Sequence, residues 1–173
     1  MIKFISKKIG VLFVVSLLST IQSCGIYSFS GASIPETMKT VSIRNFENTA
    51  PLVIPYLSQQ LTKALEDRVR NNSRLSVIRS DADAIFEGRI TGYNVSATAV
   101  QGNNQSTTSR LTITVHVKYQ NNLKPELSFE QDFTQFKDFS IVGKPLEAQQ
   151  QDLITDINQR LTEDIFNRAF ANW

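Results

Sequence analysis

The chain has a single cysteine, Cys24, and its surroundings point to one chemical use of the thiol. It follows an apolar run at residues 9–18, which is preceded by three lysines and followed by the short segment 19–23. Lysines of this kind stay in the cytoplasm while a short apolar helix enters the translocon. Ser23 supplies the small residue that a signal peptidase needs before its cut. We expect cleavage before Cys24 and acylation (palmitate among the acyl chains) of its thiol and new amine.

Three other interpretations of this segment compete with a lipid anchor. A transmembrane helix needs about 20 apolar residues, and the run at 9–18 is shorter. An ordinary secretory signal cut elsewhere is an alternative because Gln22 is an unusual residue in a lipoprotein signal. A redox or metal role for Cys24 has little support, since no second thiol or His/Asp cluster accompanies it.

Cleavage would leave residues 24–173, a length that suits one domain with a real core. Loss of residues 1–23 removes three lysines and no acids, so 18 basic against 16 acidic residues become 15 against 16. No cluster of lysines or arginines remains, which argues against nucleic acid as a partner. Gly25 follows the cysteine where an Asp would favour retention in the inner membrane. We therefore expect anchorage in the outer membrane, facing the periplasm.

The chain contains few residues that could serve as catalytic groups. His116, the sole histidine, falls on the polar side of an alternating strand, where an exposed residue is a simpler interpretation than a base. No metalloprotease, dithiol, nucleophile-elbow or phosphate-loop motif occurs. The acid pairs Asp81/Asp83 and Glu163/Asp164 suit a turn and a solvated helix face. The sequence predicts no enzyme, no cofactor and no metal site.

The spacing of apolar residues predicts three strands and a helix in the first part of the chain. Residues 40–46 alternate as a strand, a helix with an apolar stripe starts near Pro55 and ends at 71–73, and residues 75–78 form a second strand. Residues 84–100 form a long strand whose apolar parity switches midway, which a one-residue bulge near Gly88 or Gly92 would repair.

The second half of the chain carries the clearest patterns. Residues 110–119 alternate between apolar and polar, a further strand includes residues 127–133, and the apolar stripe from Pro145 to Asn172 predicts a long helix. The fold class predicted is α+β, a two-layer sandwich. A mostly antiparallel sheet of four to five strands is covered on one face by two helices.

Several segments together resemble a known family. They are GIYSFSGASIP at 25–35, VSIRNF at 41–46, FEGRITGY at 86–93, RLTITV at 110–115 and LTEDIFNRA at 161–169. In order and spacing they resemble the LptE family of lipopolysaccharide-assembly lipoproteins, in a divergent branch outside the enterobacteria. The resemblance implies a non-enzymatic plug and assembly partner of the outer-membrane barrel LptD, and a fold of two helices on a four-stranded sheet.

Candidate binding residues then follow from strand and loop positions. The loop from Gln101 to Ser109 is small and amide-rich, so Gln101, Asn103, Asn104 and Gln105 are candidates for contact with the barrel; a hairpin tip without a partner explains them as well. Arg89, Arg110 and Lys118 are candidates for lipid A phosphates, because they project from neighbouring strands on the polar side. A merely solvated sheet face is the competing account of these cations.

A second function is compatible with the same sequence. A small periplasmic lipoprotein could scaffold or activate another envelope enzyme, such as a peptidoglycan synthase. The barrel partnership is preferred because no long disordered tether follows Cys24 to reach across the periplasm.

Overall fold

The computed structural model describes residues 34–101 and 105–171, and its helices and strands follow the order that the sequence predicts. In chain order these are β1 (Thr40–Ile43), β2 (Glu47–Asn48), α2 (Leu57–Asn72), β3 (Ser76–Ile78), β4 (Ala84–Gln101), β5 (Gln105–Asn121), β6 (Phe129–Ser140) and α3 (Gln150–Phe170). The last helix begins later than the predicted Pro145, because Leu146–Ala148 form a 3-10 turn and Gln149, with φ of −127°, interrupts the helical geometry.

The strands form one mixed sheet of six strands in the order β3-β1-β4-β5-β6, with β2 paired to β4. The long strands β4, β5 and β6 are antiparallel, whereas β1 runs parallel to both β3 and β4, and β2 runs parallel to β4. The α+β class with a mostly antiparallel sheet is therefore confirmed. The sheet has one strand more than the predicted maximum of five.

The additional strand arises where the predicted strand 40–46 breaks. β1 ends at Ile43, and Phe46 turns into the core, where its side chain is fully buried. Its backbone N–H donates a hydrogen bond to Thr62 Oγ1 of α2 at 3.0 Å. The chain then rejoins β4 at Glu47–Asn48 as β2. The alternation of residues 40–46 therefore gave no sign that the chain leaves the sheet after Ile43.

The parity switch predicted in the long strand is present as a bulge. Ile90 pairs with Val115 and Gly92 with Thr114, so one extra residue, Thr91, sits between the two pairs. Ile90 and Tyr93 are consequently both buried, although their spacing in the sequence is odd. The bulge lies beside Gly92, one of the two glycines that the sequence suggested.

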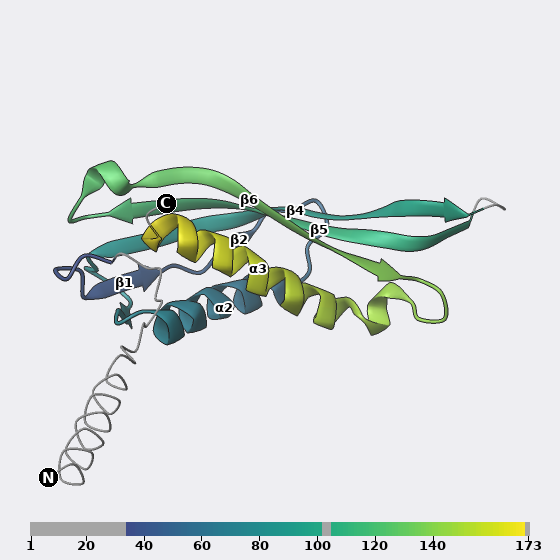
Figure 1. Ribbon diagram of the computed structural model, residues 1–173, viewed down its shortest axis with the longest axis horizontal. Coiled ribbons are helices and arrows are strands. Elements are labelled where there is room, and N and C mark those ends of the chain that lie inside the picture. Colours follow the sequence, from purple (N-terminus) through teal and green to yellow (C-terminus); the bar gives the residue numbers. More distant parts are fainter. Residues whose placement is uncertain (1–33, 102–104, 172–173) are drawn as a thin grey trace, which may run out of the picture. The chain divides into compact units, whose positions relative to one another are not determined.

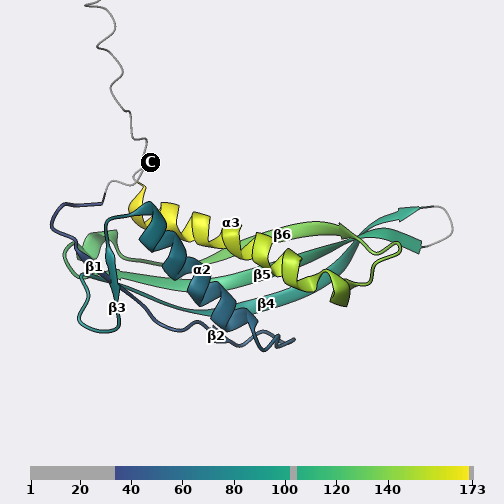
Figure 2. The same cartoon turned by 90° about the horizontal axis from the view of Figure 1, so that it is seen from below.

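Both helices cover the same face of the sheet (Figures 1 and 2). Helix α2 packs near β1 and β3, helix α3 packs on β5 and β6, and the two helices contact each other. The apolar stripes of both helices, including Leu61 and Ile157, are buried against the alternating apolar residues of β4 and β5. Within the described ranges, the opposite face of the sheet carries no helix.

The helices are too short to cover the whole length of the sheet. At ordinary rises per residue, α3 spans about 31 Å, whereas β4 spans about 60 Å. Figure 1 shows the β4–β5 hairpin running past the end of α3. Val95 lies two residues after the buried Tyr93 on the same strand, yet it is 39% exposed, although its partner Leu111 on β5 is fully buried. Residues 94–98 are all exposed.

Candidate partner-binding surfaces

The helix-free face of the sheet is polar, as the alternation of β5 predicted. Arg110, Thr112, Thr114, His116 and Lys118 all lie on it, between buried apolar residues. Opposite them β6 contributes acids, because Lys118 pairs with Glu130, His116 with Asp132 and Arg110 with Asp138. The face therefore carries a series of cross-strand pairs in which a basic residue on β5 faces an acid on β6.

His116 is held by two carboxylates at once. Its Nδ1 lies 2.7 Å from Asp132 Oδ1 and its Nε2 lies 2.8 Å from Glu130 Oε1. These hydrogen bonds, led by the one to Glu130, raise the pKa of His116 above its usual range, although Arg89 nearby opposes the shift. When both ring nitrogens carry protons, neither is free to act as a base. The geometry favours a structural role over general-base chemistry.

Arg89 and Lys118 lie on either side of this histidine. Arg89 pairs with His116 across the β4–β5 ladder, and Lys118 follows two positions along β5. Together with Arg44, Glu87 and Glu130 they line a shallow cavity of about 300 Å³. Arg44 forms an ion pair with Glu87. Among the residues that the structure describes, Arg89 and Lys118 form no ion pair. The pKa of Glu130 is nevertheless lowered by its hydrogen bond to His116 and by charge attraction from Lys118 and Arg89.

Arg110 is separated from those two cations and already has a partner. Its Nε and one terminal nitrogen donate to the two oxygens of Asp138 at 2.7 and 2.9 Å, and its guanidinium carbon lies 3.8 Å from the centre of the Phe136 ring. The pKa of Asp138 is lowered by the hydrogen bond from Arg110. The rise along β5 from Arg110 to Lys118 corresponds to about 27 Å. The three candidate cations therefore do not form one site.

The hairpin candidates fall partly outside the described residues. Gln101 ends β4 and pairs with Gln105, which begins β5. Asn103 and Asn104 lie outside the described ranges. Farther from the turn, residues 94–98 of β4 expose small and uncharged side chains on both faces.

An apolar patch near this hairpin was not identified from the sequence. Ile141 and Val142 follow β6, whose last residue pairs with Thr108 of the hairpin, and they are 42% and 68% exposed. Phe136 on β6 is 42% exposed as well. The only signal in the sequence was an apolar pair directly before Gly143, which adopts φ of +72°. Because Ile141 and Val142 are adjacent and both exposed, they are candidates for a contact surface.

Cys24 and residues 1–23 lie outside the described residues. In the described ranges, neither helix is both long and apolar enough to cross a membrane. Over the same residues, no group of three or more His, Cys, Asp or Glu side chains is arranged to hold a metal ion.

The fold and these surfaces define a small α+β domain with a polar sheet face, a long uncovered hairpin and a neighbouring apolar patch. The family model for LptE, described as lipopolysaccharide-assembly, matches residues 38–169, and the chain belongs to this family. A comparison with curated proteins finds no match.

Solved structures share the same fold at low sequence identity. Rare lipoprotein B from Shewanella oneidensis has a TM-score of 0.55 at 11% identity, covering 75% of this chain and 92% of that one. A hypothetical protein from Chlamydia trachomatis has a TM-score of 0.54 at 9% identity, covering 78% and 99%. An uncharacterized lipoprotein B from Nitrosomonas europaea has a TM-score of 0.52 at 15% identity, covering 75% and 80%.

Proposed function

We propose that this protein is a lipid-anchored, non-enzymatic partner of an LptD-type barrel in the outer membrane, where it supports assembly of the barrel and delivery of lipopolysaccharide to the outer leaflet. The observation that carries this proposal is the family match over residues 38–169. Cleavage before Cys24 would tether the domain to the periplasmic leaflet, with residues 24–39 between the anchor and the first strand, which begins at Thr40.

The surfaces of the domain suit a partner with a wet interior. A barrel lumen presents polar groups, and the polar sheet face together with the exposed tip residues 94–98 can hydrogen-bond to them. The apolar patch of Ile141 and Val142 lies near the same hairpin and would add contact area that excludes water. We therefore assign the hairpin end, with Gln101 and Gln105, to the barrel interface.

Lipopolysaccharide contact is assigned to the cavity beside His116. Arg89 and Lys118 line this cavity without forming an ion pair in the described ranges, although Glu130 lies near both, and a phosphate could accept hydrogen bonds from both. Arg110 is a weaker candidate because Asp138 already occupies its guanidinium fork. Purified Arg89→Ala/Lys118→Ala protein should lose binding to lipopolysaccharide micelles, whereas Arg110→Ala should lose much less. Equal loss in both variants would contradict this assignment.

The partnership itself is tested by affinity purification of the native lipoprotein from outer membranes. A large barrel should copurify, and depletion of the lipoprotein should leave that barrel misfolded. Recovery of a peptidoglycan synthase without any barrel would overturn the proposal and favour a scaffolding role for an envelope enzyme.

A further inference from the structure

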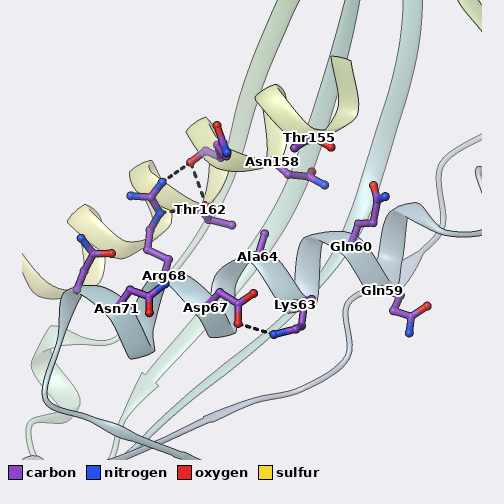
Figure 3. A pocket seen from close by; sticks show the side chains of 12 residues that line it. Gln59, Gln60, Lys63, Ala64, Asp67, Arg68, Asn71, Thr155, Asn158 and Thr162 are labelled. Atoms are coloured by element: carbon purple, nitrogen blue, oxygen red, sulfur yellow. Dashed lines mark hydrogen bonds and ion pairs between the residues drawn. The ribbon is translucent and has the colours of Figure 1, made fainter. Parts of the chain in front are cut away.

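A groove with a volume of about 700 Å³ lies between α2 and α3. Helix α2 lines it with Gln60, Ala64 and Arg68, and helix α3 lines it with Asn158 and Thr162. Figure 3 shows these side chains coming from the two neighbouring helices. The surfaces discussed above use the other face of the sheet and the hairpin, so they leave this groove unexplained.

Two buried amide oxygens in this groove have no hydrogen-bond partner. They are Gln60 Oε1 on α2 and Asn158 Oδ1 on α3, and within the described ranges no other buried side-chain nitrogen or oxygen lacks one. Asn158 is only 2% exposed, so water has little access to its oxygen. A buried amide oxygen without a donor destabilises a folded protein. Both exceptions line the same groove, so an occupant with N–H groups would satisfy them together.

The charged groups of the groove already neutralise one another. Lys63 forms an ion pair with Asp67, one turn away on α2. Arg68 donates to the backbone oxygen of Gln159 at 2.8 Å and to Thr162 Oγ1 at 3.2 Å, which ties the two helices together at one end of the groove. Its guanidinium also lies 3.8 Å from Glu163. An uncharged occupant therefore matches the groove better than a phosphate or a carboxylate does.

The lining distinguishes between two uncharged occupants, a polypeptide and a sugar. The described residues that line the groove supply amide and hydroxyl groups, aliphatic stems and Ala64, but no aromatic ring of the kind on which sugars stack. A side-chain amide offers one acceptor and two donors, so it can pair with the C=O and N–H groups of an extended backbone. These features favour a polypeptide.

We propose that the α2–α3 groove binds an extended, uncharged segment of the partner barrel's polypeptide, whose peptide groups hydrogen-bond to the side-chain amides of Gln60 and Asn158. This inference rests on the proposed function, because the barrel supplies the segment. In the complex both orphaned oxygens gain donors, and the penalty that they impose on the free protein is removed.

The test compares Asn158→Leu and Gln60→Leu with a matched control, Gln151→Leu, which replaces an exposed amide of α3 outside the groove. Each full-length lipoprotein is purified with its barrel, and the stability of the lipoprotein alone is measured by thermal unfolding. Asn158→Leu should raise the unfolding midpoint and weaken barrel retention about tenfold. The control should change neither quantity. Normal retention by both groove variants would overturn the inference.

A second measurement keeps Gln60 and Asn158 intact, so it does not depend on how those variants fold. A photo-crosslinking amino acid replaces Ala64 in the purified complex, and the crosslinked peptides are identified by mass spectrometry. Crosslinks confined to one contiguous barrel segment are expected. If the barrel copurifies but the residue at position 64 crosslinks to lipopolysaccharide or to nothing, the groove inference fails and the barrel partnership stands. If no barrel copurifies, the proposed function fails, and the groove inference with it.

Discussion

Gly88→Ala should destabilise this domain strongly, because the Phe46 ring occupies the space that a side chain at position 88 would need. A Cβ atom built on Gly88 would lie 2.5 Å from Phe46 Cε1 and 2.5 Å from the backbone oxygen of His116. Phe46 is fully buried, and its backbone N–H donates to Thr62 of α2, so a shift of the ring would disturb its packing in the core. Overpacking of this kind costs typically about 1–3 kcal/mol.

We expect about 2–3 kcal/mol here, near the upper end of that range, because one of the two clashes involves backbone. For a domain of this size such a loss lowers the unfolding midpoint by roughly 5–10 °C. Differential scanning calorimetry measures the change in the unfolding midpoint, and urea unfolding monitored by circular dichroism measures the loss of free energy.

Gly92→Ala is the matched control on the same strand. Its Cβ would lie 3.2 Å from the Thr114 Cβ atom, a side-chain contact that a small shift can relieve, so the loss should stay below about 1 kcal/mol. In a double-mutant cycle, Phe46→Leu should reduce the free energy of unfolding by less in the Gly88→Ala protein than in the unaltered protein, because it removes one of the two clashes. Equal stability of the Gly88→Ala and Gly92→Ala proteins would refute this account of the packing.

Three further predictions concern charge and anchorage. The pKa of His116 is raised in the folded protein, so its contribution to stability should be complete below the unfolded pKa of about 6.5 and disappear as pH rises through the folded pKa. His116→Gln should remove this pH dependence, a change of about 0.5 kcal/mol in the free energy of unfolding measured with urea. Asp83 Oδ2 accepts hydrogen bonds from the N–H groups of Lys39 and Thr40, and these lower the pKa of its carboxyl below 3.8. The stabilisation by this carboxylate should therefore be present at neutral pH and disappear in acid. Asp83→Ala should unfold at a lower urea concentration than the unaltered protein at pH 7, and the two midpoints should lie closer together below pH 3.8. Cys24→Ala should release a folded, soluble protein that recovers less barrel, because the effective concentration at the membrane is lost; membrane retention of this variant without any partner would contradict the lipid anchor.

The sequence predicted the elements whose patterns are local. The alternation at 110–119 identified β5, and the parity switch within residues 84–100 identified the bulge beside Gly92. Both patterns arise because successive residues of a strand point to opposite faces of the sheet, and only one of those faces is covered by helices. Fold class and element order could therefore be derived without any structure.

Features that depend on distant contacts were missed. Phe46 looks like one more residue of a strand at 40–46, but β1 stops at Ile43 and the Phe46 ring packs over Gly88. Gly88 was considered a candidate for the bulge, but its role is close approach to Phe46.

The separation between the candidate cations has a similar origin. Sequence parity put Arg110 and Lys118 on one face, which is where both lie. Only the cross-strand contacts show that Asp138 occupies Arg110, whereas Lys118 forms no ion pair among the described residues. Partners on another strand leave no local signal in the alternation of β5, so the difference between the two cations required the fold.

The uncovered length of the β4–β5 hairpin links the fold to the proposed role. Folding alone would favour strands no longer than the helices that cover them, since an exposed ribbon gains little burial. Here β4 is about twice as long as α3, and beyond Tyr93 its described side chains are small, uncharged and exposed. The β4 side of this ribbon adds little to the stability of the free domain, whereas Leu111 on the β5 side is fully buried. A shortening that keeps Leu111 should therefore leave the unfolding midpoint nearly unchanged. A shortened hairpin that also retained the barrel at full strength would show that this end of the molecule is not the interface.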